Sequence, residues 1–422
     1  MPMPRPSLPV ELLPLRHVRA VLGTVVTVSL MAGCVFGGRH REAVRPPVLP
    51  AGFADSVRTE RVDGGALLHT IINLRAPWRA YVVEQDLRCA SVRAVKGSPT
   101  TVGRTTTSAL LAALPDDQRA YAAVNADFFL FTPPGVPTNL HVEHGTLLSG
   151  PGPKPVFTFD GRRAFAIDTI VARGALLRGR DTLVALTAWN RPAPRQNGIV
   201  DARWGVALDT VVRTRALRLV PAVSGAGLQV HAQSSRGGVG RYVVLAAGPG
   251  DPLATGDTLL LHLDARTHRA NRVRPGDTVQ LSLSLLTARN TSAVVREAVG
   301  GRPIVLRDSV ITADVDTEGN DGFRNLNPRT AVGVDQAGRR AWYAVIDGRQ
   351  PGYSMGMTLR QVGELLQALG AAHGLNLDGG GSSALAIRSL ANRQVRVVNR
   401  PSDKVERPVG NALALLARCE RP

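Results

Sequence analysis

The chain has 422 residues and a formal net charge of +18 at pH 7, and its basic residues are nearly all arginine. Aromatic residues make up only 4%, so the hydrophobic core must be built mainly from aliphatic side chains. A strongly basic protein can attract polyanions, but here the basic residues are scattered along the chain rather than clustered. This spread argues against a nucleic-acid-binding protein and leaves a weak affinity for anionic glycans as the better interpretation.

The N-terminus has the form of an export signal. Arg16 and Arg19 precede an apolar run over residues 20–32, which is too short to span a bilayer. The run ends in Met-Ala-Gly-Cys, which resembles a bacterial lipobox with Cys34 as the lipidated first residue of the mature protein. An ordinary cleaved signal peptide is the alternative, and both interpretations export the protein.

We therefore predict a lipoprotein signal peptide over 1–33 and a flexible tether over 34–57, which is rich in Pro, Gly and Arg. The remainder, 58–422, is expected to form one unit with a strand-rich middle lobe at about 170–300. The predicted location is the bacterial cell envelope, periplasmic or at the outer membrane, with membrane contact only through the lipid anchor.

Two cysteines remain once Cys34 is lipidated. They are Cys89 in an early strand and Cys419 near the C-terminus. Because an exported protein meets an oxidising compartment, we predict a Cys89–Cys419 disulfide that joins the two ends of the folded chain.

Short runs of strand character dominate the chain, with few helical patterns between them. The expected helices lie at 108–114 and 359–369. This arrangement predicts an α+β fold with mixed β-sheets and few helices. The expected strands lie at 80–83, 91–95, 157–159, 164–168, 217–220, 242–246, 258–263, 279–285, 304–306, 341–346, 395–398 and 413–417.

The most informative stretch is Asp378-Gly379-Gly380-Gly381-Ser382-Ser383, which lies between two apolar runs. The pattern predicts a strand, a tight turn and a second strand. Three glycines are tolerated where the backbone turns through positive φ or approaches a bound group, and their free N–H groups can form an anion-binding concavity. An ordinary β-turn with a capping aspartate explains the same residues.

A strand and a helix precede this turn. The strand leads into Asp347-Gly348-Arg349, and Thr358 and Gln361 then form a capping box at the start of the helix. Because a strand–helix–strand crossover usually leaves its two strands parallel, we expect Asp347 and Asp378 to emerge at the same edge of a sheet.

These motifs, together with Arg329-Thr330-Ala331-Val332-Gly333, resemble the phosphodiester glycosidase family. An earlier strand carries Asn125-Ala126-Asp127-Phe128-Phe129, which resembles the family's Asn-Gly-Asp-Phe-Phe element with Ala126 in place of Gly. Taken alone, Asn125 and Asp127 also fit an ordinary turn. The resemblance covers, in patches, most of the chain after residue 75.

The resemblance implies hydrolysis of the bond between the anomeric carbon of a sugar and a phosphate. The resemblance also implies that the substrate is a phosphorylated glycan or glycolipid and that the fold is that of the family's catalytic domain. We assign Arg329 and the turn over 379–382 to the phosphate, because guanidinium and backbone N–H groups bind phosphate oxygens. Arg349 and Arg407 are further phosphate candidates.

The catalytic candidates are three aspartates. Asp378 and Asp347 would act at the anomeric carbon, while Asn125 and Asp127 would hold sugar hydroxyls or a catalytic water. The sequence does not order these roles, which stay interchangeable among the three aspartates.

A metal site is suggested by Asp314-x-Asp316-x-Glu318, which imitates the start of a calcium loop. The twelfth position is Asn325, where such loops use a bidentate glutamate. The pattern therefore favours a solvated acidic loop; no cofactor is certain, and a divalent cation such as calcium stays open.

Other enzyme classes fit less well. A serine hydrolase would need a G-x-S-x-G elbow, which Gly380-Gly381-Ser382-Ser383-Ala384 lacks, and no Gly-Lys-Ser/Thr of a P-loop follows the glycines. The alternative that remains is a non-catalytic, glycan-binding envelope lipoprotein with the same fold.

Overall fold

The structure is a computed structural model, and the residues that it describes are 44–150, 154–162, 164–193, 195–206, 215–223, 238–247, 256–264, 266, 272–289, 293–317 and 325–419. The chain divides into two units, Met1–Ala43 and Val44–Pro422. Cys34 and the predicted signal peptide lie outside the described residues. All three β-sheets belong to the second unit.

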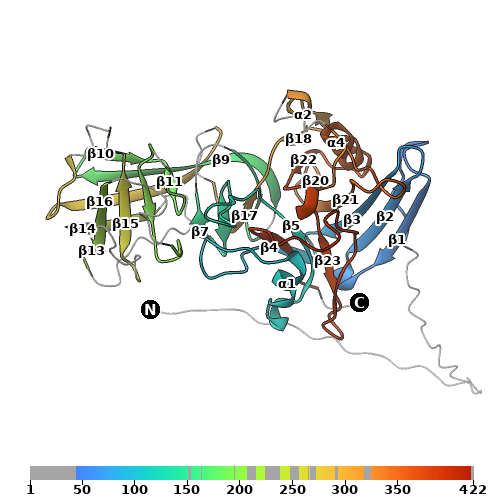
Figure 1. Ribbon diagram of the computed structural model, residues 1–422, viewed down its shortest axis with the longest axis horizontal. Coiled ribbons are helices and arrows are strands. Elements are labelled where there is room, and N and C mark those ends of the chain that lie inside the picture. The colour runs from blue at the N-terminus through green and yellow to red at the C-terminus, as the bar shows by residue number, and fades with distance from the viewer. Residues whose placement is uncertain are drawn as a thin grey trace, which may run out of the picture. The chain divides into compact units, whose positions relative to one another are not determined.

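Figure 1 shows the first sheet. It has eight strands and carries Arg329 and Asp347 at strand ends. Its order is β1 (Ser56–Arg61), β2 (Leu67–Asn73), β3 (Trp78–Asp86), β21 (Arg340–Asp347), β20 (Arg329–Val334), β22 (His373–Asn376), β18 (Ile304–Arg307) and β19 (Val310–Ile311).

The second sheet contains the strands of the predicted middle lobe and has its own aliphatic core. Its order is β11 (Ala188–Trp189), β12 (Gly198–Val200), β15 (Leu259–Leu263), β13 (Arg215–Pro221), β14 (Gly238–Ala246), β16 (Thr278–Thr287), β9 (Phe165–Arg178), β8 (Lys154–Phe159), β17 (Glu297–Gly300), β6 (His141–Glu143) and β7 (Thr146–Ser149), with β10 (Asp181–Leu186) paired to β9.

The third sheet has five strands, and helices are few among the described residues. The sheet order is β24 (Val395–Val397), β23 (Leu385–Arg388), β5 (Ala120–Asn125), β25 (Ala412–Ala417) and β4 (Ala90–Val95). The helices are α1 (Thr107–Ala112), α2 (Asp314–Thr317) and α4 (Leu359–Ala368), with short 3-10 turns η1 (Asp63–Gly65), η2 (Asp116–Gln118) and η5 (Gly380–Ser382).

Every strand expected from the sequence has a counterpart in these sheets, and both expected helices form. The protein is mostly β-sheet with few helices, so the predicted α+β class is right in outline but understates the share of sheet. α4 begins with the predicted capping box, in which the Thr358 hydroxyl accepts a hydrogen bond from the Gln361 N–H, and the Gln361 side chain accepts one from the Thr358 N–H.

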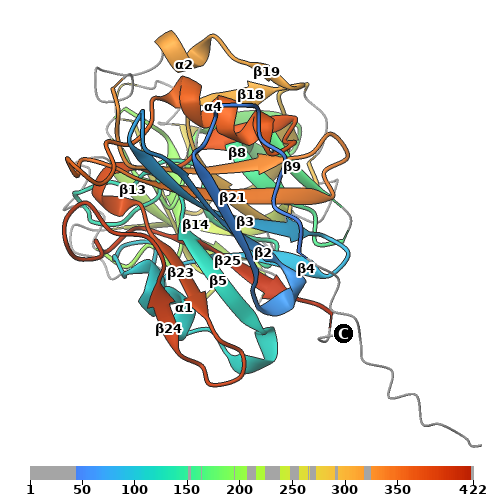
Figure 2. The same ribbon diagram turned by 90° about the vertical axis from the view of Figure 1, so that its right-hand side faces the viewer.

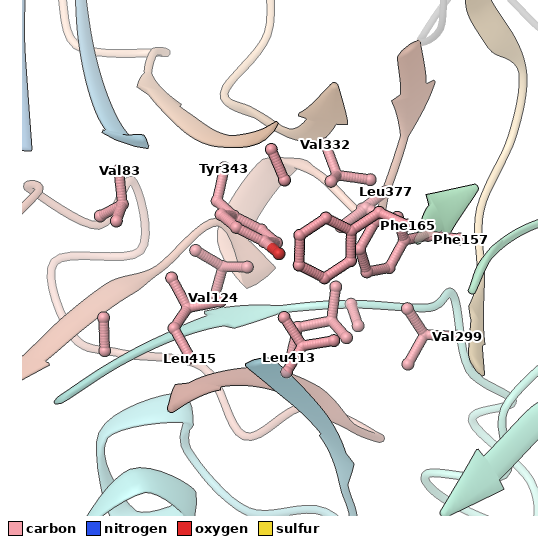
Figure 3. Close-up of a cluster of buried hydrophobic side chains, with 14 of the residues drawn as sticks. Val83, Val124, Phe157, Phe165, Val299, Val332, Tyr343, Leu377, Leu413 and Leu415 are labelled. Atoms are coloured by element: carbon pink, nitrogen blue, oxygen red, sulfur yellow. The ribbon is translucent and has the colours of Figure 1, made fainter. Parts of the chain in front are cut away.

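The eight-stranded sheet is buried on both faces. Along β21, Trp342, Ala344 and Ile346 pack with α4, while Tyr343 and Val345 point to the opposite face. Figure 2 shows α4 beside β18. Figure 3 shows the second face, where Tyr343 and Val332 meet side chains of the five-stranded sheet such as Leu413.

The pairing of β20 decides where the polar motifs lie. β20 is antiparallel to β21 and to β22, with Ala331 opposite Ala344 on one side and Asn376 on the other. β21 and β22 are therefore parallel, as the crossover rule predicts. The sequence did not predict that β20 lies between them.

The structure differs from the predicted tether over 34–57 at its C-terminal end. Phe53 lies edge-on to Trp78 with ring centroids 5.7 Å apart, and its carbonyl accepts a 2.9 Å hydrogen bond from Asn73 Nδ2. Leu49 and Val57 pack against the same core. These apolar side chains join residues 49–57 to the folded unit, which composition alone did not reveal.

The calcium-loop pattern takes another conformation. Asp314 and Asp316 lie in α2, and Asp316 forms an ion pair with the Arg360 side chain of α4. Glu318 lies outside the described residues. Across the described ranges no group of three or more His, Cys, Asp or Glu side chains could hold a metal ion. Nor does any helix within them have the length and apolar character needed to cross a membrane.

Cys89 and Cys419 form a disulfide, with Cα atoms 4.7 Å apart. It extends the pairing of β4 with β25, because Ala90 is already opposite Ala417 and the Arg418 N–H donates to the Cys89 carbonyl at 2.8 Å. The two cysteines are 330 residues apart in sequence, so the bridge closes nearly the whole folded unit into one loop.

We expect replacement of both cysteines by serine to lower the free energy of unfolding by about 2–5 kcal/mol, because the open chain gains conformational entropy when unfolded. Urea unfolding of the parent and of Cys89→Ser/Cys419→Ser measures this difference. An unchanged midpoint and slope would show that the bridge does not stabilise the fold.

Candidate active site

Three polar groups lie at one end of the eight-stranded sheet because of strand register. Arg329 begins β20 opposite Ile346, next to Asp347, the last residue of β21. On the other side of β20, the Leu377 N–H donates to the Thr330 carbonyl at 2.8 Å, so that Asp378 follows at the same end. The expectation that Asp347 and Asp378 share one edge is therefore met.

The glycine turn is a 3-10 turn, η5, and its backbone N–H groups are mostly bonded within the protein. The Gly380 N–H donates to the Pro328 carbonyl at 2.9 Å, the Ser382 N–H to the Gly379 carbonyl at 3.3 Å, and the Ser383 N–H to the Gly380 carbonyl at 3.2 Å. The predicted concavity of free N–H groups is thus wrong for these three, since the turn closes on itself and on the loop before β20.

Two glycines of the turn instead face a guanidinium group, Gly380 that of Arg349 and Gly381 that of Arg407, while Gly379 lies against the Pro328 carbonyl beside Arg329. A Cβ added at Gly380 would lie 3.3 Å from both terminal nitrogens of Arg349, and one at Gly381 would overlap the Arg407 and Asp403 side chains. Gly380 and Gly381 therefore give room for the Arg349 and Arg407 guanidinium groups, and Gly379 allows the close approach of the Pro328 carbonyl.

The arginines differ in how firmly they are held. Arg329 is only 4% exposed, and it donates from Nε to the Met357 carbonyl at 3.0 Å and from a terminal nitrogen to the Asn325 carbonyl at 2.8 Å. Burial and the neighbouring Arg349 charge lower its pKa to about 10, so it stays protonated at neutral pH. Arg407 forms an ion pair of 2.6 Å with Asp403.

Arg349 has the greatest freedom of the three to bind a ligand. Its Nε donates to Asn327 Oδ1 at 2.9 Å, and its terminal nitrogens lie against Gly380. Its backbone is left-handed, at φ 58°, a conformation that non-glycine residues rarely adopt. Such an outlier in a polar turn is typical of functional sites.

Asp378 and Asp127 form a pair of carboxyl groups with raised pKa values. The Asp378 N–H donates to the Ala126 carbonyl at 2.8 Å, which ties the two segments together. Burial raises the pKa of Asp378 to about 6, although Ser382 and Arg407 act in the opposite direction. Burial also raises the pKa of Asp127 to about 7, and the nearby Asp378 charge adds to this shift.

Asp127 is held by neighbours on two sides. Its Oδ2 accepts the Asn139 N–H at 2.8 Å, and its Oδ1 accepts the Asn139 side-chain amide at 3.2 Å and the Thr138 hydroxyl at 3.3 Å. Gly300 makes room for this contact, since a Cβ there would overlap the Asn139 side chain. The carboxyl is only 2% exposed.

A buried chain of polar side chains supports the Asp127 backbone. The Asp127 N–H donates to Asn411 Oδ1 at 2.8 Å, and Asn411 Nδ2 donates to His141 Nδ1 at 2.9 Å. His141 Nε2 then donates to Glu143 at 2.9 Å. This chain fixes both the orientation of the Asn411 amide and the tautomer of His141.

Asn125 has a connecting role in the structure. It is fully buried; its Nδ2 donates to the Asp378 carbonyl at 2.6 Å, and its Oδ1 accepts the Thr330 hydroxyl at 2.7 Å and the Ala384 N–H at 3.1 Å. These contacts join three segments that meet at the turn. The arrangement places Asn125 behind the site, where it orients Asp378.

Asp347 is 1% exposed and its carboxylate is surrounded by donors. Oδ1 accepts Asn399 Nδ2 at 3.0 Å, the Arg400 N–H lies 3.0 Å from both oxygens, and Oδ2 accepts the Tyr353 hydroxyl at 3.1 Å. Asn399 Nδ2 also donates to the Ser383 carbonyl at 3.1 Å. Asp347 thus ties the loop at 399–400 to the glycine turn.

The sequence pointed to the three aspartates and three arginines, but it gave no sign of the role of four supporting residues. These are Asn139, His141, Asn399 and Asn411, all buried. Their hydrogen-bond partners include residues distant in sequence, such as Asp127 for Asn139 and Asn411, and Asp347 for Asn399, which no local pattern identifies.

The glycine–arginine contacts yield a prediction for Gly380, at φ 63°. We expect Gly380→Ala to displace the Arg349 guanidinium and to weaken the binding of inorganic phosphate by roughly tenfold, about 1.4 kcal/mol. Gly352→Ala is the matched control, because Gly352 has φ 78° with open space around its Cα. Isothermal titration compares the two variants, and equal phosphate affinities in both would contradict the assignment.

Comparison with solved structures places this fold among known ones. A hypothetical protein from Synechocystis superposes with a TM-score of 0.65 and 18% identity, over 86% of this chain and 64% of that one. A putative exported protein from Burkholderia pseudomallei K96243 gives 0.59 and 21%, over 81% and 74%. This chain thus spans less than two thirds of the Synechocystis protein, and at these identities the likeness shows the fold alone.

A zebrafish N-acetylglucosamine-1-phosphodiester alpha-N-acetylglucosaminidase catalytic domain, auto-inhibited by its pro-peptide, aligns over 87% of this chain and 82% of its own, at 14% identity. Its TM-score of 0.38 is too low to support a conclusion about this chain. No curated protein matches the chain. Residues 230–416, which include Arg329, Asp347 and Asp378 but not Asp127, match the model of the phosphodiester glycosidase family, and this match confirms the resemblance predicted from the sequence.

Proposed function

We propose that the protein is an exported hydrolase that cleaves the sugar–phosphate bond of a glycosyl-1-phosphodiester. The observation that carries the proposal is the glycine turn, where the Asp378 carboxyl lies beside guanidinium groups. A carboxylate suits reaction at an anomeric carbon, while arginines suit a phosphate leaving group. The family match over residues 230–416 supports the same chemistry.

The proposed roles of Asp378 and of the arginines follow from accessibility and charge. Asp378 is less deeply buried than Asp127 and Asp347, so its carboxylate acts at the anomeric carbon as nucleophile or as base toward water. Arg349 and Arg407 bind the phosphate oxygens, and Arg329 contributes its positive charge from behind the turn. In the overall reaction water adds to the anomeric carbon, and the electron pair of the broken C–O bond leaves with the phosphate.

Asp127 is the second carboxyl of the site. Its pKa of about 7 leaves it protonated in about half of the molecules at neutral pH. We assign it as the acid that protonates the departing oxygen, since two neighbouring carboxyls of different pKa divide the acid and base roles. Asp347 and Asn125 position the turn rather than react.

The proposal includes a location and a substrate class. A lipid anchor on Cys34 would hold the enzyme in the bacterial envelope, where phosphorylated glycans and glycolipids carry sugar-1-phosphodiesters. Globomycin-sensitive processing of the precursor and palmitate labelling that is lost in Cys34→Ala would support the anchor, and labelling that persists in the variant would contradict it.

The central role of Asp378 is tested by turnover. Purified protein should release reducing sugar from a panel of sugar-1-phosphodiesters, and Asp378→Asn should lower kcat/KM on the order of 10³-fold, the usual contribution of a positioned acid or base. Asp308→Asn, an exposed aspartate at the β18–β19 turn, is the matched control. Binding heat without product from the parent would instead favour the glycan-binding lipoprotein, and equal rates in parent and Asp378→Asn would remove Asp378 from the mechanism.

The pKa values predict a bell-shaped pH dependence. Activity should rise with pH as Asp378 loses its proton near its pKa of about 6, and should fall as Asp127 loses its proton near its pKa of about 7. Asp127→Asn should remove the descending limb while the ascending limb remains. A profile of kcat/KM that stays flat from pH 5 to 9 in the parent would contradict both assignments.

A further inference from the structure

A second group of basic side chains surrounds Tyr353, next to the site described above. The Arg79 guanidinium carbon lies 4.5 Å from the centroid of the Tyr353 ring, and that of Arg400 lies 5.0 Å from it. Contacts of this kind are cation–π interactions, which orient a guanidinium over the ring. One ring therefore holds two positive charges close together.

Tyr353 itself is fixed in place. Its hydroxyl donates to Asp347 Oδ2 at 3.1 Å and is 3.0 Å from the Tyr81 hydroxyl. Burial, the Tyr81 contact and the Asp347 charge raise the pKa of Tyr353 well above its usual range, so the ring stays neutral. A neutral ring can hold both guanidinium groups but does not cancel their charge.

The two arginines form no ion pair in the described part of the chain, although Asp347 is opposite Arg79 in the sheet and its carboxylate interacts electrostatically with Arg400. In the described part of the chain, neither Arg79 nor Arg400 lies within ion-pair distance of an aspartate or glutamate, whereas Arg407 is paired with Asp403. Arg79 Nε is buried without a hydrogen-bond partner in the structure. Two like charges close together repel each other; Asp347 offsets part of this repulsion, and an anionic ligand would offset more of it.

The tyrosine cluster, formed by Arg79, Arg400 and Tyr353, is joined to the glycine turn through hydrogen bonds. The Arg400 N–H binds Asp347, and the Asn399 side chain bridges Asp347 and the Ser383 carbonyl. Gln350 Nε2 donates to the Arg400 carbonyl at 2.9 Å, and the residue before Gln350 is the arginine that lies against Gly380. The same short loops thus carry both sets of arginines.

Exposure indicates which part of a substrate would reach the cluster. Asp127 and Asp347 are almost completely buried, while Arg400 is exposed and Arg79 and Tyr353 are half-buried. With the sugar placed at Asp378, as proposed above, the leaving part of the substrate would extend toward the more exposed side chains, which are those of the tyrosine cluster.

We infer that Arg79, Arg400 and Tyr353 form a subsite for a second phosphate group, carried by the leaving part of the substrate. This rests on the proposed function and deepens it: the substrate class becomes a glycosyl phosphodiester whose aglycone bears another phosphate, as in a polymer with repeating phosphodiesters or a phosphorylated lipid head group. The planar edges of the two guanidinium groups bind the phosphate oxygens in pairs.

Binding of small phosphates tests this subsite without knowledge of the sugar. The probes are α,ω-diol monophosphates and bisphosphates with two to four carbons, titrated at fixed low salt. The parent is expected to bind at least one bisphosphate ten times more tightly than its monophosphate. Arg79→Gln/Arg400→Gln should lose this preference and keep the monophosphate affinity.

The control is Arg75→Gln/Arg396→Gln, which removes the same charge from two exposed arginines whose nearest carboxylates lie 3.8 and 3.7 Å away. This variant should keep the preference, and thermal melting should show that both variants fold. A parent without any preference, or a preference that survives in Arg79→Gln/Arg400→Gln, would overturn the subsite.

Turnover decides separately about the proposed function. If the bisphosphate preference behaves as expected but no sugar is released from any phosphodiester, the subsite stands and the hydrolase proposal fails. If sugar is released but the preference is absent, the hydrolase proposal stands and the subsite fails.

Discussion

Antiparallel pairing of β20 with both β21 and β22 is the constraint on which the candidate site depends. A strand in this position places its own first residue, Arg329, between the ends of its two neighbours, from which Asp347 and Asp378 emerge. Both faces of this sheet are buried, so a slip of one residue would turn apolar side chains such as Tyr343 to the wrong layer. The core therefore fixes the register, and the register fixes the site.

In the turn after β22, the backbone N–H groups and the neighbouring arginine side chains have different roles. The N–H groups of Gly380, Ser382 and Ser383 bond to carbonyl groups of the protein, and arginine side chains lie against Gly380 and Gly381. Buried Arg329 has a lowered pKa and like-charged Arg349 close by, an arrangement that favours a bound anion. Gly380 and Gly381 matter because a Cβ at either position would crowd the Arg349 or the Arg407 guanidinium group.

The sequence predicted correctly the features that depend on residues close together in the chain. The capping box at Thr358, the strand runs and the Asp-Gly corners each depend on a few neighbouring residues, and each forms as expected. It did not predict the features that depend on contacts between residues far apart in the chain. The insertion of β20, the buried chain from Asp127 to His141, and the packing of Phe53 on Trp78 all join segments that no local pattern connects. Asp347 was recognised as a polar residue at a strand end, but only the structure shows that its oxygens are taken up by Asn399, Arg400 and Tyr353.

The most direct test is a crystal structure of Asp378→Asn with a sugar-1-phosphodiester bound. We predict that the phosphate lies within hydrogen-bond distance of the Arg349 and Arg407 guanidinium groups, with the anomeric carbon next to residue 378. A ligand bound elsewhere, or one whose phosphate contacts neither arginine, would contradict the central claim that the glycine turn and its arginines form a phosphate site.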